Sequence, residues 1–113
     1  MILYGIKNCD TVKKARKWLE AHRVEYRFHD LRVDGLDPTR LSTWVRAIGW
    51  EALLNRRGTT WRGLSESERA DLDEERAMAL MLAHPSLIKR PVLEYGGALR
   101  VGFDEADYAE RFA

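Results

Sequence analysis

Cysteine is scarce in this chain, whose 113 residues include only Cys9. A single cysteine excludes an internal disulfide and any zinc or iron–sulfur site built from several thiolates, and it fits a reducing compartment. An excess of charge of one sign is also missing, because 19 lysines and arginines balance 18 acids to a net charge of +1. No overall field draws such a protein toward nucleic acid or a membrane, and we expect neither as a partner.

Long apolar runs are absent as well. The longest, around residues 77–83, is far shorter than a membrane span, and the N-terminus lacks the pattern of a signal peptide. There is no internal repeat and no low-complexity segment. With 45% apolar residues, the sequence predicts one globular domain over 1–113, which we expect to be cytoplasmic and monomeric.

The first 21 residues carry the main chemical signal. Apolar residues at 2–6 predict a strand, and an amphipathic pattern that Asp10 or Thr11 can cap, with apolar positions from Val12 to His22, predicts a helix. Cys9 lies at the junction, where unpaired N–H groups and the helix dipole favour the thiolate. Lys13 follows one turn later on the same face, as one of five cations between residues 7 and 17. The alternative is a small buried Cys9 beside solvated lysines.

The rest of the chain alternates between strand and helix patterns. Residues 24–29 alternate as a strand does, which completes a βαβ unit with parallel strands. Asp37-Pro38 opens a helix that Gly49 closes, and a short helical turn at 50–55 precedes a polar loop at 56–60. Ser65 opens a short helix reaching about Leu72, and a further helix from 73 ends at His84-Pro85.

The last third predicts a hairpin and a helix. Two β-type runs at 92–95 and 98–101 flank Gly96-Gly97, and Asp104 can cap a final helix whose apolar stripe includes Tyr108. The order is β-α-β, a helical insertion at about 37–84, and β-β-α. It predicts an α/β protein of thioredoxin-like fold with a four-stranded mixed sheet.

Three segments resemble one family. They are residues 4–11 (YGIKNCDT), 53–62 (LLNRRGTTWR) and 88–93 (IKRPVL), and together they resemble the arsenate reductase (ArsC)/Spx family, closest to its YffB-like branch. The resemblance covers essentially the whole chain. It implies a thioredoxin-like fold, a catalytic thiol at Cys9, and arginines that hold an anionic substrate, which map onto Arg90 and Arg100. Pro91 resembles the cis-proline that such folds place facing the cysteine.

Two departures from the family pattern bear on function. Arsenate reductases carry a histidine a few residues before the cysteine and an arginine directly after the middle Leu-Leu, where this chain has Gly5 and Asn55. This argues against arsenate as the natural substrate. Spx-type regulators carry a second cysteine three residues after the first, where this chain has Val12, so a redox-switching regulator would lose its switch.

A lone thiol needs an outside thiol to complete a redox cycle, and glutathione is the abundant candidate. We therefore expect a glutathione-dependent thiol/disulfide reductase with no tightly bound cofactor and no metal, acting on a thiol, disulfide or oxyanion substrate. Glutaredoxin is a candidate protein partner. The expected site comprises Cys9, Arg90, Pro91, Arg100, Lys13 and Arg56. Two alternatives stay open: an Spx-like interaction protein of the transcription machinery without catalysis, and a true arsenate reductase.

Overall fold

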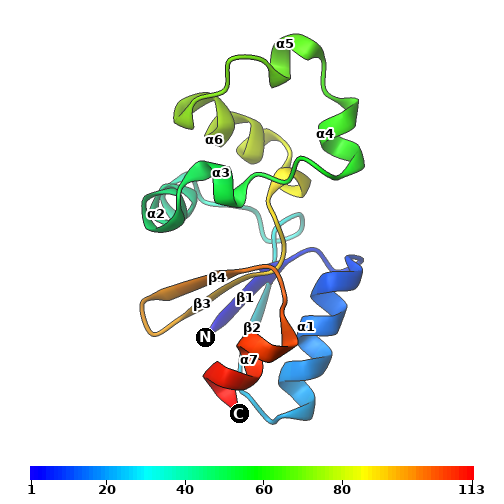
Figure 1. The fold of residues 1–113 in the computed structure, drawn as a ribbon, viewed down its shortest axis with the longest axis vertical. Coiled ribbons are helices and arrows are strands. Elements are labelled where there is room, and N and C mark those ends of the chain that lie inside the picture. The colour runs from blue at the N-terminus through cyan, green and yellow to red at the C-terminus, as the bar shows by residue number, and fades with distance from the viewer. The chain divides into compact units, whose positions relative to one another are not determined.

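A computed structural model describes residues 1–113. The chain forms two compact units, one made of residues 1–35 with 90–113 and the other of residues 36–89. The first unit contains a four-stranded sheet with a helix at each end of the sequence, and the second contains helices, turns and an isolated β-bridge between Leu54 and Ile88 (Figure 1). The predicted α/β fold is confirmed. The predicted insertion at about 37–84 lies within the helical unit.

The sheet has the strand order β2-β1-β3-β4. β1 (Ile2–Gly5) pairs in parallel with β2 (Arg27–Asp30) and antiparallel with β3 (Val92–Tyr95), which in turn pairs with β4 (Ala98–Val101). The parallel pair and the hairpin thus lie side by side, as predicted. The hairpin turns at Gly96 and Gly97, whose φ values of 50° and 80° belong to the left-handed region that glycine adopts without steric cost.

Both helices of the sheet unit share one core. α1 (Asp10–Ala21) buries an apolar stripe at helical spacing, and α7 (Glu105–Phe112) is capped by Asp104, whose carboxylate accepts from two backbone N–H groups. Leu3 and Leu93, which face each other across β1 and β3, supply the sheet's part of this core. Its buried members are Leu3, Ala15, Trp18, Leu19, Leu93 and Tyr108.

Three details of this unit differ from the sequence prediction. Cys9, rather than Asp10 or Thr11, is the N-cap of α1. β2 begins at Arg27 instead of Val24, and Tyr26 uses its hydroxyl to accept from Arg16 and to donate to Glu20 on α1. His22, predicted on the apolar stripe, is exposed, since α1 ends at Ala21 and the His22 N–H closes its last turn.

The helical unit follows its capping signals closely. α2 (Pro38–Ile48) starts at Asp37, which accepts from the Thr39 N–H at 3.0 Å, and ends at Gly49 with φ 85°. α3 (Trp50–Leu53) is the predicted short turn. α6 (Glu74–Ala83) is capped by Asp73 and ends before Pro85, where a 3₁₀ turn (Pro85–Leu87) follows.

The middle of this unit was predicted less well. The end of the segment predicted as a polar loop at 56–60 overlaps a short helix, α4 (Thr59–Gly63). In this helix the hydroxyl of Thr60 is hydrogen-bonded to the hydroxyl of Ser86 at 2.7 Å, a tertiary contact that no local pattern predicts. The capping box at Ser65 and Glu68 is present, but α5 (Glu66–Arg69) ends three residues before Leu72. None of the helices in either unit combines the length and apolar composition needed to cross a membrane.

Candidate functional site

Three chain segments meet at one end of the sheet. Gly5 at the end of β1 pairs with Asp30 at the end of β2, and Tyr4 pairs with Val92 at the start of β3. The loop from β1 to α1 and the Arg90-Pro91 pair before β3 therefore lie at the same end of the sheet. This end, outside the carboxyl ends of the parallel strands, is where α/β proteins commonly place their sites.

Cys9 occupies the N-cap of α1 in an extended backbone conformation, with φ −90° and ψ 125°. Its carbonyl accepts the Lys13 N–H at 2.9 Å, which is the first hydrogen bond of the helix, and its own N–H donates to the Ile6 carbonyl at 3.1 Å. The backbone of Cys9 is thus fixed on both sides, and the residue is partly exposed.

The surroundings of Cys9 favour its ionised form. Partial burial acts to raise the pKa of the thiol, but the N–H of Val12, a hydrogen bond from Arg90, the positive charge of Arg90 and the N–H of Thr11 outweigh it. The net effect holds the pKa of Cys9 below the ordinary value. The sulfur does not make a side-chain cap hydrogen bond of normal geometry. The N–H groups of Thr11 and Val12 nevertheless belong to the second and third helical residues, from which an N-cap side chain ordinarily accepts a hydrogen bond.

Arg90 and Pro91 approach the thiol from the start of β3. The peptide bond between them is cis, as the sequence predicted from the resemblance, and Pro91 is buried. The Pro91 carbonyl accepts the Gly102 N–H at 2.8 Å, which joins this turn to the end of β4. Arg90 is the one cationic side chain among the groups that lower the pKa of Cys9.

Asp30 is a site residue that the sequence did not single out. Its buried carboxylate accepts from the backbone N–H groups of Arg32 at 2.8 Å, Val33 at 3.2 Å and Lys7 at 3.2 Å. Burial acts to raise the pKa of Asp30, but these three N–H groups and the charge of Arg32 lower it. The bond to Lys7 ties the loop that carries Cys9 to β2. An acid directly after an alternating strand was the available signal.

Gly5 sets how closely α1 approaches the sheet. A Cβ atom at Gly5 would lie 2.7 Å from one methyl group of Val12 and 3.0 Å from the other. Val12 is fully buried in the first turn of the helix, and its branched side chain has little freedom to move. The absence of a side chain at Gly5 therefore positions the helix end that holds Cys9.

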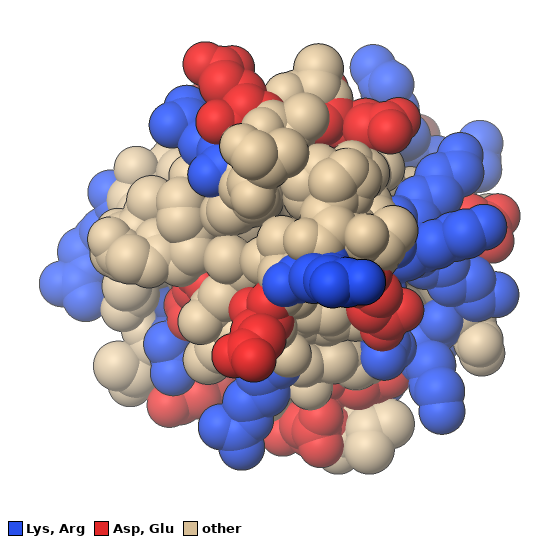
Figure 2. Space-filling model, turned by 90° about the horizontal axis from the view of Figure 1, so that it is seen from below, with Lys and Arg blue, Asp and Glu red and all other residues tan.

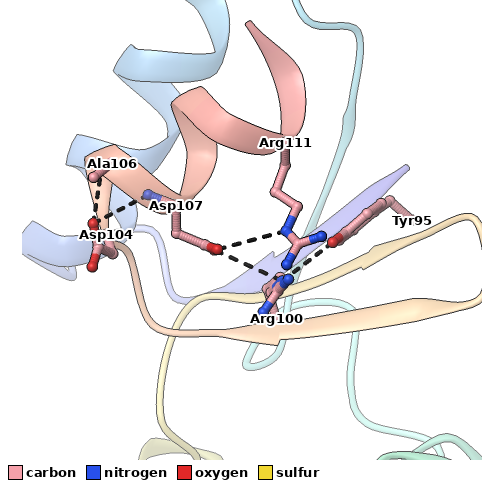
Figure 3. Close-up of polar contacts among 6 residues, drawn as sticks. All are labelled: Tyr95, Arg100, Asp104, Ala106, Asp107 and Arg111. Atoms are coloured by element: carbon pink, nitrogen blue, oxygen red, sulfur yellow. Dashed lines mark hydrogen bonds and ion pairs between the residues drawn. The ribbon is translucent and has the colours of Figure 1, made fainter.

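Arg100 is engaged away from the thiol. Its Nε donates to the Tyr95 hydroxyl at 3.2 Å and lies 3.7 Å from Oδ2 of Asp107 (Figure 3). The other carboxylate oxygen of Asp107, Oδ1, lies 3.6 Å from the Nε of Arg111. These contacts join the hairpin to α7. The structure thus gives Arg100 a local structural role, and its predicted contact with an anionic substrate stays a prediction.

Lys13 and Arg56 are both exposed. The Lys13 ammonium group is not among the groups that lower the pKa of Cys9. The contact between the two residues is the hydrogen bond from the Lys13 backbone N–H to the Cys9 carbonyl. Arg56 belongs to the helical unit, where its guanidinium lies 5.8 Å from the ring centres of both Trp50 and Trp61. It lines a basic pocket of about 490 Å³ with Trp50, Glu51, Leu54, Asn55, Arg57 and Lys89.

Comparison with known proteins places this arrangement in a family. The model of the ArsC family matches residues 4–111, which is nearly the whole chain. The chain belongs to the ArsC family. The solved structure of the YFFB (PA3664) protein is 55% identical, with a TM-score of 0.95 and coverage of 99% of this chain and 98% of the other.

Two further relatives show the range of the ArsC family. An arsenate reductase (ArsC) related protein from Brucella melitensis is 53% identical over 98% of this chain and 92% of its own, with a TM-score of 0.80. The global transcriptional regulator Spx of Lactiplantibacillus plantarum is 26% identical over 99% of this chain and 85% of its own. These relatives thus include a protein named as related to arsenate reductase and a protein named as a transcriptional regulator.

Within this ArsC-family chain, no group of three or more His, Cys, Asp and Glu side chains is arranged to hold a metal ion. The histidines serve local contacts instead. His22 stacks on Trp18 with ring centres 3.9 Å apart, and the Nε2 of His29 lies 2.7 Å from the Gly35 carbonyl oxygen. The chemistry that the site can offer is that of one activated thiol beside one guanidinium.

Proposed function

We propose that this ArsC-family protein is a glutathione-dependent thiol/disulfide reductase that works with one cysteine in a reducing compartment such as the cytoplasm. The observation that carries the proposal is the position of Cys9 at the N-cap of α1, where two helix N–H groups and Arg90 lower the pKa of its thiol. The thiolate is the nucleophilic form in thiol–disulfide exchange. The chain contains no second cysteine to resolve the product.

The reaction proceeds in two exchange steps. The Cys9 thiolate attacks the glutathione sulfur of a mixed disulfide, a new sulfur–sulfur bond forms, and the substrate leaves as a thiolate that takes a proton from water. A glutathione thiolate then attacks the glutathione sulfur bound to Cys9, which releases oxidised glutathione and restores the Cys9 thiolate. The substrate gains two electrons, and two glutathione sulfurs become one disulfide.

Cationic groups would bind the carboxylates of glutathione in this scheme. Arg90 is the first candidate, because it already contacts the thiol and can stabilise charge that develops on the departing sulfur. Pro91 would lie beside the bound glutathione at the same end of the sheet. Lys13 and Arg100 are proposed as weaker contributors to the binding of the anionic substrate, with glutaredoxin as a candidate partner.

The test uses the mixed disulfide of glutathione and 2-mercaptoethanol, with glutathione, NADPH and glutathione reductase to report oxidised glutathione. We expect turnover by the native protein and only the uncatalysed rate with Cys9→Ser. Mass spectrometry should find one glutathione per native chain and none on the variant. Arg46→Gln, which alters an exposed cation on α2 of the helical unit, serves as the matched control and should retain activity. Full activity of Cys9→Ser would refute the proposal.

The relative named as an Spx regulator supports a second candidate function, an interaction protein of the transcription machinery. Val12 stands where Spx-type regulators carry their second cysteine, so such a role here would not use a disulfide switch. The discriminating experiment measures binding to RNA polymerase before and after alkylation of Cys9. Binding that alkylation leaves unchanged, together with no turnover of the mixed disulfide, would favour the interaction protein. An arsenate-turnover assay with glutathione and glutaredoxin tests the reductase named in the family.

A further inference from the structure

We propose that a groove along α1 is a docking site for an acidic segment of a partner protein that offers one aromatic or large aliphatic side chain. The groove has a volume of about 340 Å³ and lies wholly within the sheet unit. Its lining comes from one face of α1 and from the start of α7: Lys14, Lys17, Trp18, Ala21, His22, Phe103 and Glu105. Neither Cys9 nor Arg90 is part of it.

The floor of the groove is aromatic and held in place. The His22 ring stacks on the Trp18 indole with centres 3.9 Å apart and planes 19° apart, and its Nδ1 lies 2.9 Å from the Trp18 carbonyl oxygen. Trp18 also meets Tyr108 edge-on at 5.6 Å, and Phe103 meets Tyr108 in the same way at 4.7 Å. These contacts fix the rings before any ligand arrives, so binding of an apolar side chain costs little conformational entropy in the groove.

The rim of the groove is charged asymmetrically. Lys14 and Lys17 lie one helical turn apart on the α1 side and are exposed, while Glu105 lies on the α7 side. Figure 2 shows lysine and arginine side chains gathered on the side of the molecule where Figure 1 places α1. Two ammonium groups next to an apolar floor complement a segment whose carboxylates lie on one side of an apolar anchor. Glu105 disfavours a ligand that is acidic on both sides.

Exposure argues for a protein segment over other ligands. Lys14, Lys17, Ala21 and His22 are all exposed, so the groove is open, whereas small-molecule sites bury most of their ligand's surface. Nucleic-acid binding draws its affinity from many phosphate contacts, and only two cations line this groove. The chain's net charge of +1 adds no general attraction for a polyanion.

The groove and the thiol share one helix. Lys17 follows Cys9 by eight residues, which corresponds to about 12 Å along the axis of α1. A partner bound in the groove would therefore lie near Cys9 without displacing the groups that lower its pKa. Binding at the groove does not require that Cys9 act as a reductase, and the two proposals can fail separately.

The test measures binding of the blocked peptide acetyl-Asp-Glu-Phe-Ser-Gly-amide, which is acidic on one side of its aromatic anchor, to the full chain by NMR at about 0.15 M ionic strength. We expect saturable shifts of the Trp18 indole and His22 ring signals. Lys17→Glu should weaken binding about tenfold or more, and the milder Lys14→Gln should weaken it severalfold. Arg27→Glu is the matched control, because it makes the same charge change at an exposed position of the sheet unit outside the groove, and it should change affinity less than about twofold.

Four results would overturn the inference. The first is the absence of saturable shifts, and the second is an equal loss of affinity in Arg27→Glu and Lys17→Glu. The third is tighter binding of a single-stranded oligonucleotide than of the peptide. The fourth is a shift of the same Trp18 and His22 signals that grows with protein concentration in the absence of peptide. Such a shift would assign the groove to a second copy of the chain, whose Leu72 lies between two exposed aspartates. Peptide binding by Cys9→Ser separates this inference from the reductase proposal.

Discussion

The acidity of a single thiol depends here on groups that come from distant parts of the sequence. Val12 and Thr11 follow Cys9 directly, whereas Arg90 lies 81 positions further along the chain and reaches the thiol because β3 runs beside β1. Burial alone would raise the pKa of the thiol. The lowered pKa therefore needs both the helix end and the strand pairing.

Replacing Arg90 with glutamine should raise the pKa of Cys9, because the thiolate loses one hydrogen bond and its one nearby positive charge. Since the thiolate is populated above the pKa, the rate of alkylation will rise at higher pH than in the native protein. At neutral pH we expect the rate to fall about three- to tenfold. Ultraviolet absorbance of the thiolate during a pH titration measures the shift directly.

Two variants serve as controls for the Arg90 prediction. Arg90→Lys keeps the charge and should keep part of the effect. Lys13→Gln should leave the titration of Cys9 unchanged, since the Lys13 side chain does not lower that pKa. An unchanged titration curve in Arg90→Gln would show that the helix N–H groups suffice.

Asp30→Asn should lower the free energy of unfolding at neutral pH by about 1–3 kcal/mol, because the carboxylate accepts three backbone N–H groups while buried. The folded-state pKa of Asp30 is lowered, so its ionised form stabilises the fold above the unfolded value of about 3.9. This contribution is lost as pH falls through the folded pKa. Urea denaturation between neutral and acidic pH should show a shallower pH dependence in Asp30→Asn.

The exposed Glu25 provides the control for Asp30. Glu25→Gln should change the free energy of unfolding by less than about 0.5 kcal/mol and leave its pH dependence intact. Equal acid sensitivity of the native protein and Asp30→Asn would mean that other carboxylates dominate acid unfolding.

At the level of elements, the start of α1 is set by its packing on β1. Gly5 leaves room for Val12, and the Asp30 carboxylate holds the loop between strand and helix. The sequence pattern predicted both elements but placed the N-cap at Asp10 or Thr11, since cysteine is not a preferred capping residue. The N-cap at Cys9 results from this packing, which a linear pattern does not contain.

Gly5→Ala should lower the free energy of unfolding by about 1–3 kcal/mol, because its methyl group would lie 2.7 Å from a methyl group of the buried Val12. The first turn of α1 would have to shift, so the alkylation rate of Cys9 should change as well. Adding Val12→Ala makes room for the new methyl group. In a double-mutant cycle by urea denaturation, the combined loss should be smaller than the sum of the single losses. Strict additivity would contradict the proposed clash.

Across the whole molecule, burial is distributed unevenly. α1 buries four residues, whereas α4 and α5 bury none. Segments with few buried apolar contacts open locally at low cost in free energy. The short helices of the helical unit should therefore open without unfolding of the sheet unit.

Amide hydrogen exchange should reveal this difference. We expect exchange in α4 and α5 to be about 100-fold or more faster than in α1 and β1. Ser65→Ala removes the capping box and should speed exchange in α5 further while leaving α1 unchanged. Uniform protection along the chain would instead indicate that the molecule opens only as one cooperative unit.

The sequence by itself determined the order of the main strands and helices, several of their ends and the location of the single thiol between β1 and α1. These are local properties: Asp37-Pro38, Gly96-Gly97 and the capping box at Ser65 act through neighbouring backbone groups. The short helix after Gly58 and the truncated β2 escaped prediction, because each depends on contacts between segments distant in sequence.

Only the tertiary structure decided which groups act on the thiol. The sequence pointed to Lys13 because it lies one helical turn from Cys9, but exposed side chains at that spacing need not reach the sulfur. Arg90 reaches it through strand pairing, and Asp30 holds the loop through parallel pairing of β1 with β2. The geometry of a site depends on distances through space, which helical spacing and residue order specify only within one element.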